Sequence, residues 1–150
     1  MGYRSDVRII VSKKGYKELK KFVDEDAKKY ATPDYDHNLL NNLDVKIEND
    51  HEVLIGWNYI KWYQPNADWY QDVGCIERGL DHLNELGYST HFARIGEDYG
   101  DIDEFNNECW LDEYELDYPY IVRCFDDALP THNNSLESRQ TDADQSKGDE

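Results

Sequence analysis

A strand pattern followed directly by a helix pattern occupies the first thirty residues, and this pairing most constrains the fold. Val7-Arg-Ile-Ile-Val11 is a continuous β-branched run, typical of a central strand buried on both faces. Ser12 then offers an oxygen to cap a helix that ends before Thr32-Pro33. The apolar residues of this helix recur at steps of three and four, with lysines between them: Tyr16, Leu19, Phe22, Val23, Ala27 and Tyr30.

A hairpin and a second helix are predicted next. Residues 43–48 alternate apolar and charged side chains, Asn49-Asp50-His51 supplies a turn, and residues 53–63 form the second strand. Apolar residues then repeat at helical spacing over 69–83, and Gly87 can close that helix. The middle of the chain therefore predicts a hairpin followed by a helix.

Two more strands complete the predicted fold, one at 88–95 and one at 120–125. The resulting order, β-α-β-β-α-β-β, resembles a ferredoxin-like split sandwich with an added strand. We therefore assign the chain to the α+β class.

The composition changes abruptly after the last predicted strand. Residues 130–150 contain Leu136 and Ala143 as their only apolar side chains, too few to offset the entropy lost on ordering. We expect one domain over 1–127, of a size that can bury a core of its own, and a disordered acidic tail over 128–150.

Charge is distributed unevenly along the chain. The net charge is −17, yet residues 1–31 hold nine Lys or Arg against five Asp or Glu, so the acidic excess lies in the rest of the chain. Such a field repels nucleic acid and anionic membranes and favours a basic partner. The Lys-rich face of the first helix is either a solubilising surface or a contact for an acidic partner. That partner could be the acidic segment of another copy, which would give a homodimer.

Compartment signals in the sequence are few. No apolar run approaches the roughly 20 residues of a membrane span, and the N-terminus has no hydrophobic targeting region. Three cysteines with no close pair argue against a disulfide framework and a Cys-rich zinc site. We expect a reducing cytoplasm and no membrane contact.

The most unusual segment runs from residue 97 to residue 117 and contains no Lys or Arg. Its ten acids are Glu97, Asp98, Asp101, Asp103, Glu104, Glu108, Asp112, Glu113, Glu115 and Asp117. A solvated loop is the simplest interpretation. The functional interpretation is that fixed carboxylates interleaved with aromatic side chains imitate phosphates and stacked bases, and so bind a protein that holds DNA through Lys and Arg.

Metal and catalytic patterns are weak. Asp101-x-Asp103 could open a calcium loop, but Phe105 and Asn106 stand where that loop needs an oxygen ligand and a glycine. Loose cation binding by the acids stays open. Cys75 and His82 lie about 10 Å apart along one helix, too far for a nucleophile and its base. We predict no catalytic residue, no metal site and no cofactor.

Several short motifs resemble a group of small, mostly uncharacterised acidic bacteriophage proteins. The resemblance covers most of residues 1–125 and rests on five segments, namely Met1-Gly-Tyr-Arg-Ser-Asp-Val7, Lys61-Trp62-Tyr63, Gly87-Tyr88, Arg94-Ile-Gly-Glu-Asp98 and Asp101-Ile102. It implies a setting and no particular chemistry. Small acidic phage proteins include inhibitors of host defence, both anti-restriction and anti-CRISPR, some of which resemble DNA in charge.

These observations lead to a functional hypothesis. We expect a non-enzymatic inhibitor in the cytoplasm of the bacterial host, occupying the basic nucleic-acid channel of a CRISPR effector or restriction nuclease and not binding nucleic acid directly. The ten acids would pair with Lys and Arg of the target, with Trp110 and Tyr114 as anchors. The alternatives are a phage accessory or assembly protein that self-associates, and a magnesium-dependent hydrolase.

Overall fold

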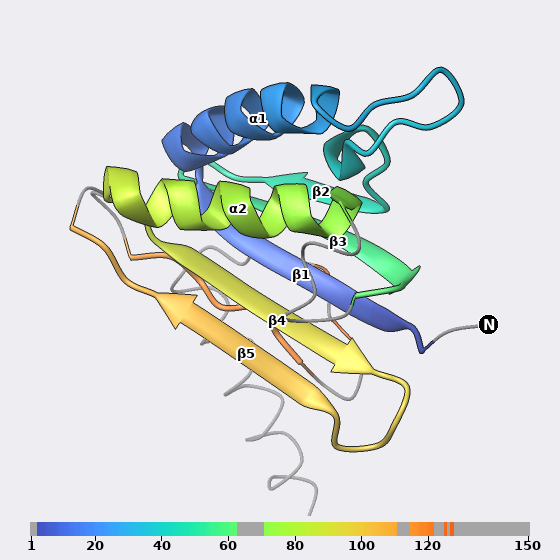
Figure 1. Ribbon diagram of the computed structural model, residues 1–150. Helices are drawn as coiled ribbons and strands as arrows, with labels where there is room; N and C mark the ends of the chain where they lie inside the picture. Colours follow the sequence, from blue (N-terminus) through green and yellow to red (C-terminus); the bar gives the residue numbers. More distant parts are fainter. Residues whose placement is uncertain (1–2, 63–70, 111–114, 122–124, 126, 128–150) are drawn as a thin grey trace, which may run out of the picture.

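A five-stranded antiparallel sheet carries two helices on one face (Figure 1). The computed structural model describes residues 3–62, 71–110, 115–121, 125 and 127. The chain order is β1 (Ser5–Ser12), α1 (Lys13–Lys28), a 3₁₀ turn (Leu39–Asn41), β2 (Val45–Glu48), β3 (Glu52–Ile60), α2 (Gln71–Leu86), β4 (Thr90–Gly96) and β5 (Ile102–Asn107). The predicted α+β class and the order β-α-β-β-α-β-β are confirmed.

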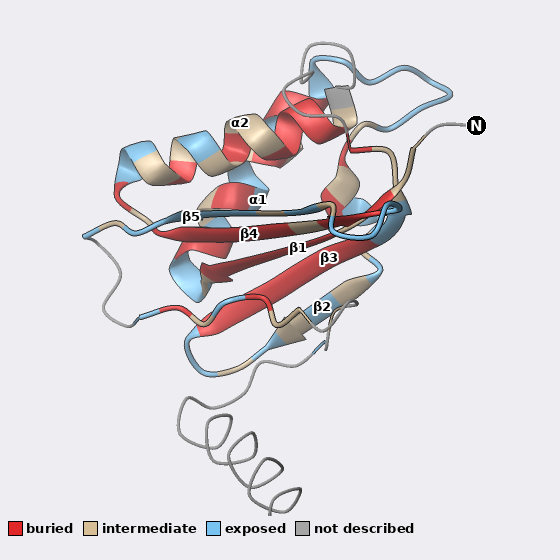
Figure 2. Ribbon diagram, turned by 90° about the horizontal axis from the view of Figure 1, so that it is seen from below, coloured by how far each residue is buried: buried red, intermediate tan, exposed pale blue. Residues whose placement is uncertain are grey.

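The sheet order is β2-β3-β1-β4-β5, so β1 lies between β3 and β4 as in a ferredoxin-like split sandwich. β5 extends that arrangement beyond β4. In Figure 2 the three central strands are mainly buried, while β2 and β5 are more exposed. The addition of β5 therefore moves the sheet edge outward, past the strand that α2 covers.

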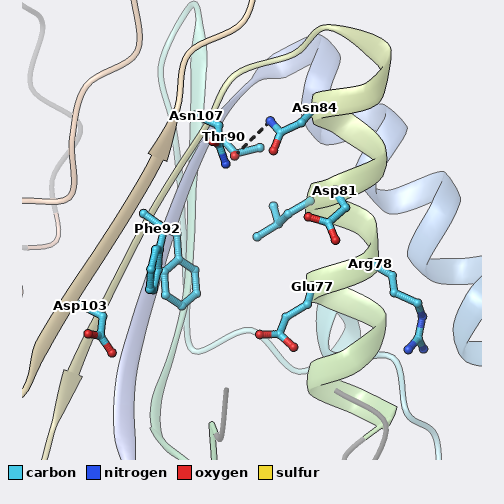
Figure 3. Close-up of a pocket in the computed structure, with 10 residues that line it drawn as sticks. Glu77, Arg78, Asp81, Asn84, Thr90, Phe92, Asp103 and Asn107 are labelled. Atoms are coloured by element: carbon cyan, nitrogen blue, oxygen red, sulfur yellow. Dashed lines mark hydrogen bonds between the residues drawn. The ribbon is translucent and has the colours of Figure 1, made fainter. Parts of the chain in front are cut away.

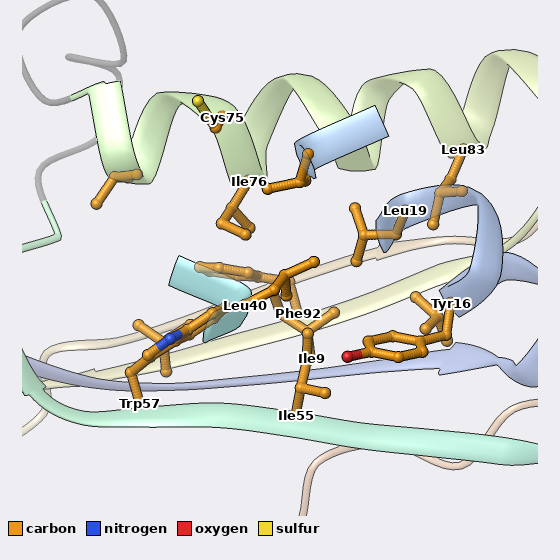
Figure 4. Close-up of a cluster of buried hydrophobic side chains, with 14 of the residues drawn as sticks. Ile9, Tyr16, Leu19, Leu40, Ile55, Trp57, Cys75, Ile76, Leu83 and Phe92 are labelled. Carbon is orange, nitrogen blue, oxygen red and sulfur yellow. The ribbon is translucent and has the colours of Figure 1, made fainter. Parts of the chain in front are cut away.

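The main core lies between the helices and the sheet (Figure 4). Val7, Ile9 and Val11 of β1 are fully buried there. Helix α1 begins because Ser12 Oγ accepts a hydrogen bond from Gly15 N at 3.0 Å. Helix α2 approaches α1 closely at Gly79, where an added Cβ would lie 2.6 Å from Leu19 Cδ1. The predicted central strand and both predicted helices are confirmed.

The sheet face opposite the helices is covered in part by residues that follow β5. Leu116 is 3% exposed and packs with Ile10 and Leu54 in a second apolar cluster. Arg8, at 3% exposure, points to the same side and binds Asp127, with 2.6 Å between Nε and Oδ1. Leu116, Phe125 and Asp127 thus contact this face of the sheet, and the last two account for the burial of Arg8.

The position of the fifth strand differs from the prediction. The strand lies at Ile102–Asn107, inside the acidic segment, whereas the described residues of 120–125 form an isolated bridge between Ile121 and Phe125. A hairpin with β4 is favoured because its short connection costs little closure entropy, and because it pairs Phe92 with Phe105. The predicted disordered tail, 128–150, lies outside the described residues.

Candidate functional site

The predicted acidic surface is divided into two groups by β5. Glu97, Asp98 and Asp101 lie in the turn between β4 and β5, and Asp103 follows within β5. The second group faces the side opposite the helices or lies beyond β5, and comprises Glu104, Glu108, Glu115 and Asp117. A six-residue strand spans about 20 Å, so the eight described acids do not form one continuous row. Asp112, Glu113 and Tyr114 lie outside the described residues.

Arg94 neutralises part of the first group. Its Nη2 lies 2.7 Å from Asp101 Oδ1 and 2.6 Å from Asp103 Oδ2, and Nε also binds Asp103. The guanidinium beside Asp101 holds the pKa of that carboxyl below its usual value, with a smaller contribution from the Tyr3 hydroxyl. Asp101 and Asp103 therefore stiffen the hairpin, and Glu97 and Asp98 are its more exposed acids.

Tyr3 fixes the hairpin from the N-terminal side. Its hydroxyl donates to Asp101 Oδ2 at 2.6 Å and accepts from Asp98 N at 2.8 Å. Gly96 leaves room for this pair, because an added Cβ would lie 2.5 Å from the Tyr3 hydroxyl and 2.0 Å from Asp101 Oδ2 and would displace them. The backbone of Arg4 also donates to Glu97. The chain near residue 3 and the chain near residue 97 thus support one rigid turn.

Two of the sequence motifs meet in this turn. Residues 3–6 belong to the first motif and residues 94–98 to the fourth, and besides the Tyr3 contacts, Arg94 Nη1 donates to Ser5 Oγ at 2.8 Å. Tyr99 projects from the turn with 87% of its surface exposed. The motifs therefore build a supported hairpin that presents two carboxylates and an aromatic ring to solvent.

Glu108 is held by a buried histidine. His91 is fully buried, its Nδ1 lies 2.7 Å from the carbonyl oxygen of Asp117, and its Nε2 contacts the Glu108 carboxylate. A carbonyl oxygen only accepts, so Nδ1 is the donor in its hydrogen bond to Asp117 O. Tyr118 stacks on the imidazole with 4.2 Å between ring centroids. His91 therefore links Glu108, just after β5, to Asp117, which adjoins the Leu116 that packs on the sheet.

Glu52 also binds Asp117, by a hydrogen bond from the backbone. One carboxylate oxygen accepts from Asp117 N at 2.6 Å, and the other accepts from the side chain of Asn49 at 3.2 Å. Burial raises the pKa of Glu52 above its ordinary value, although the hydrogen bond from Asp117 N opposes that change. Burial therefore disfavours the charged form of Glu52, which lies beside Asp117 on the sheet face opposite the helices.

A groove separates α2 from the exposed part of β5 (Figure 3). Its volume is about 610 Å³, and Leu80, Phe92 and Phe105 form its apolar part. Asp81 and Asp103 stand on opposite sides of it, and the Asn84 amide binds Thr90 at one end. Helix α2 packs on β4, so the added strand leaves Phe105 51% exposed beneath this opening.

The structure places Cys75 and His82 in separate environments. Cys75 is buried, which raises the pKa of its thiol to about 12, and His82 instead stacks on Phe22. No cluster of three or more His, Cys, Asp or Glu able to hold a metal ion occurs among these residues. None of the helices in the described part of the chain is long and apolar enough to cross a membrane.

Comparison with family models, with curated proteins and with solved structures finds no match to this chain. The candidate site is therefore defined by its own geometry.

Several residues of the site were missed by sequence reasoning. Arg94 lies three residues before the acidic segment, and its role depends on cross-strand register with Asp103. Tyr3 and His91 act through contacts 98 and 17 residues away along the chain. The sequence carried only a weak signal for β5. Ile102 and Phe105 are apolar and the two residues between them are acidic, which is a partial match to the alternation of a strand. Trp110, a predicted anchor, is 82% exposed and available for contact.

Proposed function

We propose that this protein is a non-enzymatic binding protein that presents its β4–β5 hairpin and the nearby exposed carboxylates to a basic, nucleic-acid-binding surface of a partner protein. The observation that carries the proposal is the rigid support of the turn by Tyr3 and Arg94, which fixes Glu97 and Asp98 in space. Pre-organised charges lose little entropy on binding, so they give a partner more affinity than charges on a flexible loop.

Exposure of aromatic rings beside these charges supports the same function. Tyr99 and Trp110 are 87% and 82% exposed, and large aromatic rings are favoured as anchors in interfaces. Glu104 and Glu115 add exposed carboxylates. A basic channel that normally binds phosphates and bases offers both kinds of contact, cations for the acids and planar groups for the rings.

The resemblance of the motifs to phage proteins favours a defence nuclease as that partner, such as a CRISPR effector or a restriction enzyme of the bacterial host. The protein would inhibit the nuclease by occupying its channel. A phage accessory or assembly protein that self-associates remains the alternative, and the exposed edge strand β5 is the observation that favours it.

The test is capture of partners from host lysate by the tagged protein, with washes at rising salt and mass spectrometry of the eluate. We expect recovery of a basic nucleic-acid-binding protein that is lost at high salt, because exposed charge pairs are screened. Recovery of phage structural proteins alone, or of the protein itself alone, would support the assembly alternative.

A pair of charge-matched variants makes the test specific to this surface. One variant carries Glu97→Gln, Asp98→Asn, Glu104→Gln and Glu115→Gln, which keep hydrogen-bond acceptors at each position. The control carries Glu25→Gln, Glu48→Gln, Asp50→Asn and Glu85→Gln, four exposed acids elsewhere. The first variant should lose the partner and the control should retain it. Equal loss in both would show that net charge, and not the hairpin surface, determines binding.

A further inference from the structure

The outer edge of β5 carries backbone groups directed away from the sheet. β5 is the last strand in the sheet order, and Gly96 N donates to Asp101 O at 2.8 Å where the β4–β5 ladder begins. Hydrogen-bonded and non-hydrogen-bonded pairs alternate along an antiparallel ladder. The N–H and C=O groups of Glu104 and Asn106 therefore point to the outer edge, which no other strand of the described residues occupies, while those of the intervening residues bind β4. Ile102 N also points outward, but it donates to Gly100 O at 3.0 Å within the turn.

The two faces beside this edge differ in chemistry. Successive strand residues point to opposite faces. On the helix side Phe105 lies under the groove with Leu80 and Phe92, and the opening of about 610 Å³ is large enough for side chains (Figure 3). On the opposite side Glu104 presents its carboxylate, and Glu108 follows just beyond the strand, where its partly exposed carboxylate also contacts His91. On one face an incoming strand would meet the apolar Leu80, Phe92 and Phe105, flanked by the acids Glu77, Asp81 and Asp103. On the other face it would meet Glu104 and Glu108.

Protection against aggregation does not account for both features. Charged residues on an edge strand discourage pairing with other chains. That role needs Asp103 and Glu104, but it needs neither a half-exposed Phe105 nor a groove above it. An opening with an apolar floor adjacent to this edge instead fits strand addition, in which backbone bonds give affinity and pockets select alternate side chains.

The charge identifies the occupant. A second copy of β5 would bring two more carboxylates beside Asp103 and Glu104, and this accumulation of like charge opposes its association. The residues 128–150 of this chain are also acidic, with five Asp or Glu against two Lys or Arg. A segment with basic side chains is complementary to Glu104 and Glu108 instead.

We propose that an extended segment of a partner protein, in which basic and apolar residues alternate, adds antiparallel to the free edge of β5. Its apolar side chains enter the groove over Phe105, and its basic side chains lie on the opposite face beside Glu104 and Glu108. This interaction goes beyond the hairpin function proposed above, because the hairpin can bind a basic surface while the groove stays empty.

The probe is a fluorescein-labelled, end-blocked octapeptide in which lysine alternates with valine, titrated with the full chain and followed by fluorescence anisotropy. A peptide in which glutamate replaces lysine is the charge control. Saturable binding of the lysine peptide and at least a tenfold weaker response to the glutamate peptide are expected. Failure of the lysine peptide to bind the folded protein overturns the proposal.

A variant of the edge tests where the peptide binds. Glu104→Pro removes an outward N–H without removing a bond to β4, and Glu48→Pro makes the equivalent change in β2 at the opposite edge of the sheet. We expect at least a tenfold loss of affinity for Glu104→Pro and no loss for Glu48→Pro. The double variant Glu97→Gln, Asp98→Asn should bind the peptide as the natural chain does. Loss in that double variant with none in Glu104→Pro would place the peptide on the hairpin and overturn edge binding.

Methylated peptides provide a measurement that does not depend on how a proline variant folds. In the proposed register the lysine N–H groups point toward β5, because they lie opposite Glu104, while the valine N–H groups point away. N-methylation of the lysine residues should abolish binding, and N-methylation of the valine residues should preserve it. Equal affinity of the two methylated peptides rules out strand addition.

Discussion

Arg94 in β4 lies directly opposite Asp103 in β5, and its Nη2 bridges Asp103 Oδ2 at 2.6 Å and Asp101 Oδ1 at 2.7 Å. One guanidinium therefore joins the strand to the turn that precedes it. The consequence is that a segment rich in like charges folds as a hairpin, with two of its acids paired.

Replacement of Arg94 by lysine is expected to loosen the hairpin. Lysine keeps the charge but lacks the planar group that binds two carboxylates at once. We expect a loss of about 1–2 kcal/mol in the free energy of unfolding, measured in urea, because charge-assisted hydrogen bonds are lost. Arg4→Lys is the control, since the Arg4 side chain lies over the Tyr59 ring and should contribute little. An equal effect of the two changes would contradict the special role of Arg94.

The lowered pKa of Asp101 predicts that the folded protein loses stability in acid. Arg94 lowers its pKa in the folded state relative to the ordinary value of 3.8, so the unfolded chain takes up the proton first as the pH falls. The stabilising contribution is complete above 3.8 and is lost as the pH falls through the lowered folded value. Asp101→Asn should destabilise the protein at neutral pH, and urea unfolding should show the difference shrinking as the pH falls below about 4. A difference that stays constant with pH would show that the charge of Asp101 contributes nothing.

The fold was predictable from the sequence where local patterns and burial agree. The run Val7 to Val11 and the helical repeats produce β1, α1 and α2 as expected, because each pattern is strong enough to specify its own element. β5 was missed because Ile102–Asn107 has no clean alternation. Its stability as a strand depends on pairing with β4, which is a tertiary effect that overrides local propensity.

The acids of the site were predictable as residues but not as an arrangement. Their number follows from the sequence, whereas their division into two groups follows from the position of β5. Tyr3 and His91 bind carbonyl, amide and carboxylate groups contributed by distant segments, and no short spacing in the sequence indicates these contacts. Such long-range pairings are set by strand register and not by local sequence.

Close contact between the helices predicts an unusual response at Gly79. Replacing glycine by alanine inside a helix normally stabilises it by about 1 kcal/mol. Here an added Cβ would lie 2.6 Å from Leu19 Cδ1 and 3.0 Å from Val23 Cγ2, so these two fully buried side chains must shift in a packed core. We expect Gly79→Ala to lower the free energy of unfolding by about 1–2 kcal/mol. Glu85→Ala on the exposed side of α2 serves as the control, and a stabilising effect of Gly79→Ala would show that Leu19 and Val23 move aside at little cost.

The raised pKa of Glu52 predicts that its contribution to the free energy of unfolding changes with pH in the opposite direction to that of Asp101. Burial raises its pKa in the folded state above the ordinary value of 4.5, so the folded chain holds the proton more tightly than the unfolded chain does. Stability contributed by the protonated group is therefore present below 4.5 and is lost as the pH rises through the raised folded value. Glu52→Gln keeps an oxygen to accept from Asp117 N but removes the buried charge.

The Glu52→Gln variant should accordingly be more stable than the natural chain at neutral pH, and this advantage should diminish as the pH is lowered toward 4.5. Urea unfolding across that range measures it, with Glu48→Gln as the control because Glu48 is exposed on β2. A Glu52→Gln variant that is less stable at neutral pH would mean that the hydrogen bond from Asp117 N requires a full charge on its acceptor. In that case the charged Glu52 carboxylate would stabilise the fold through its hydrogen bond to Asp117, and this gain would exceed the free-energy cost of its burial.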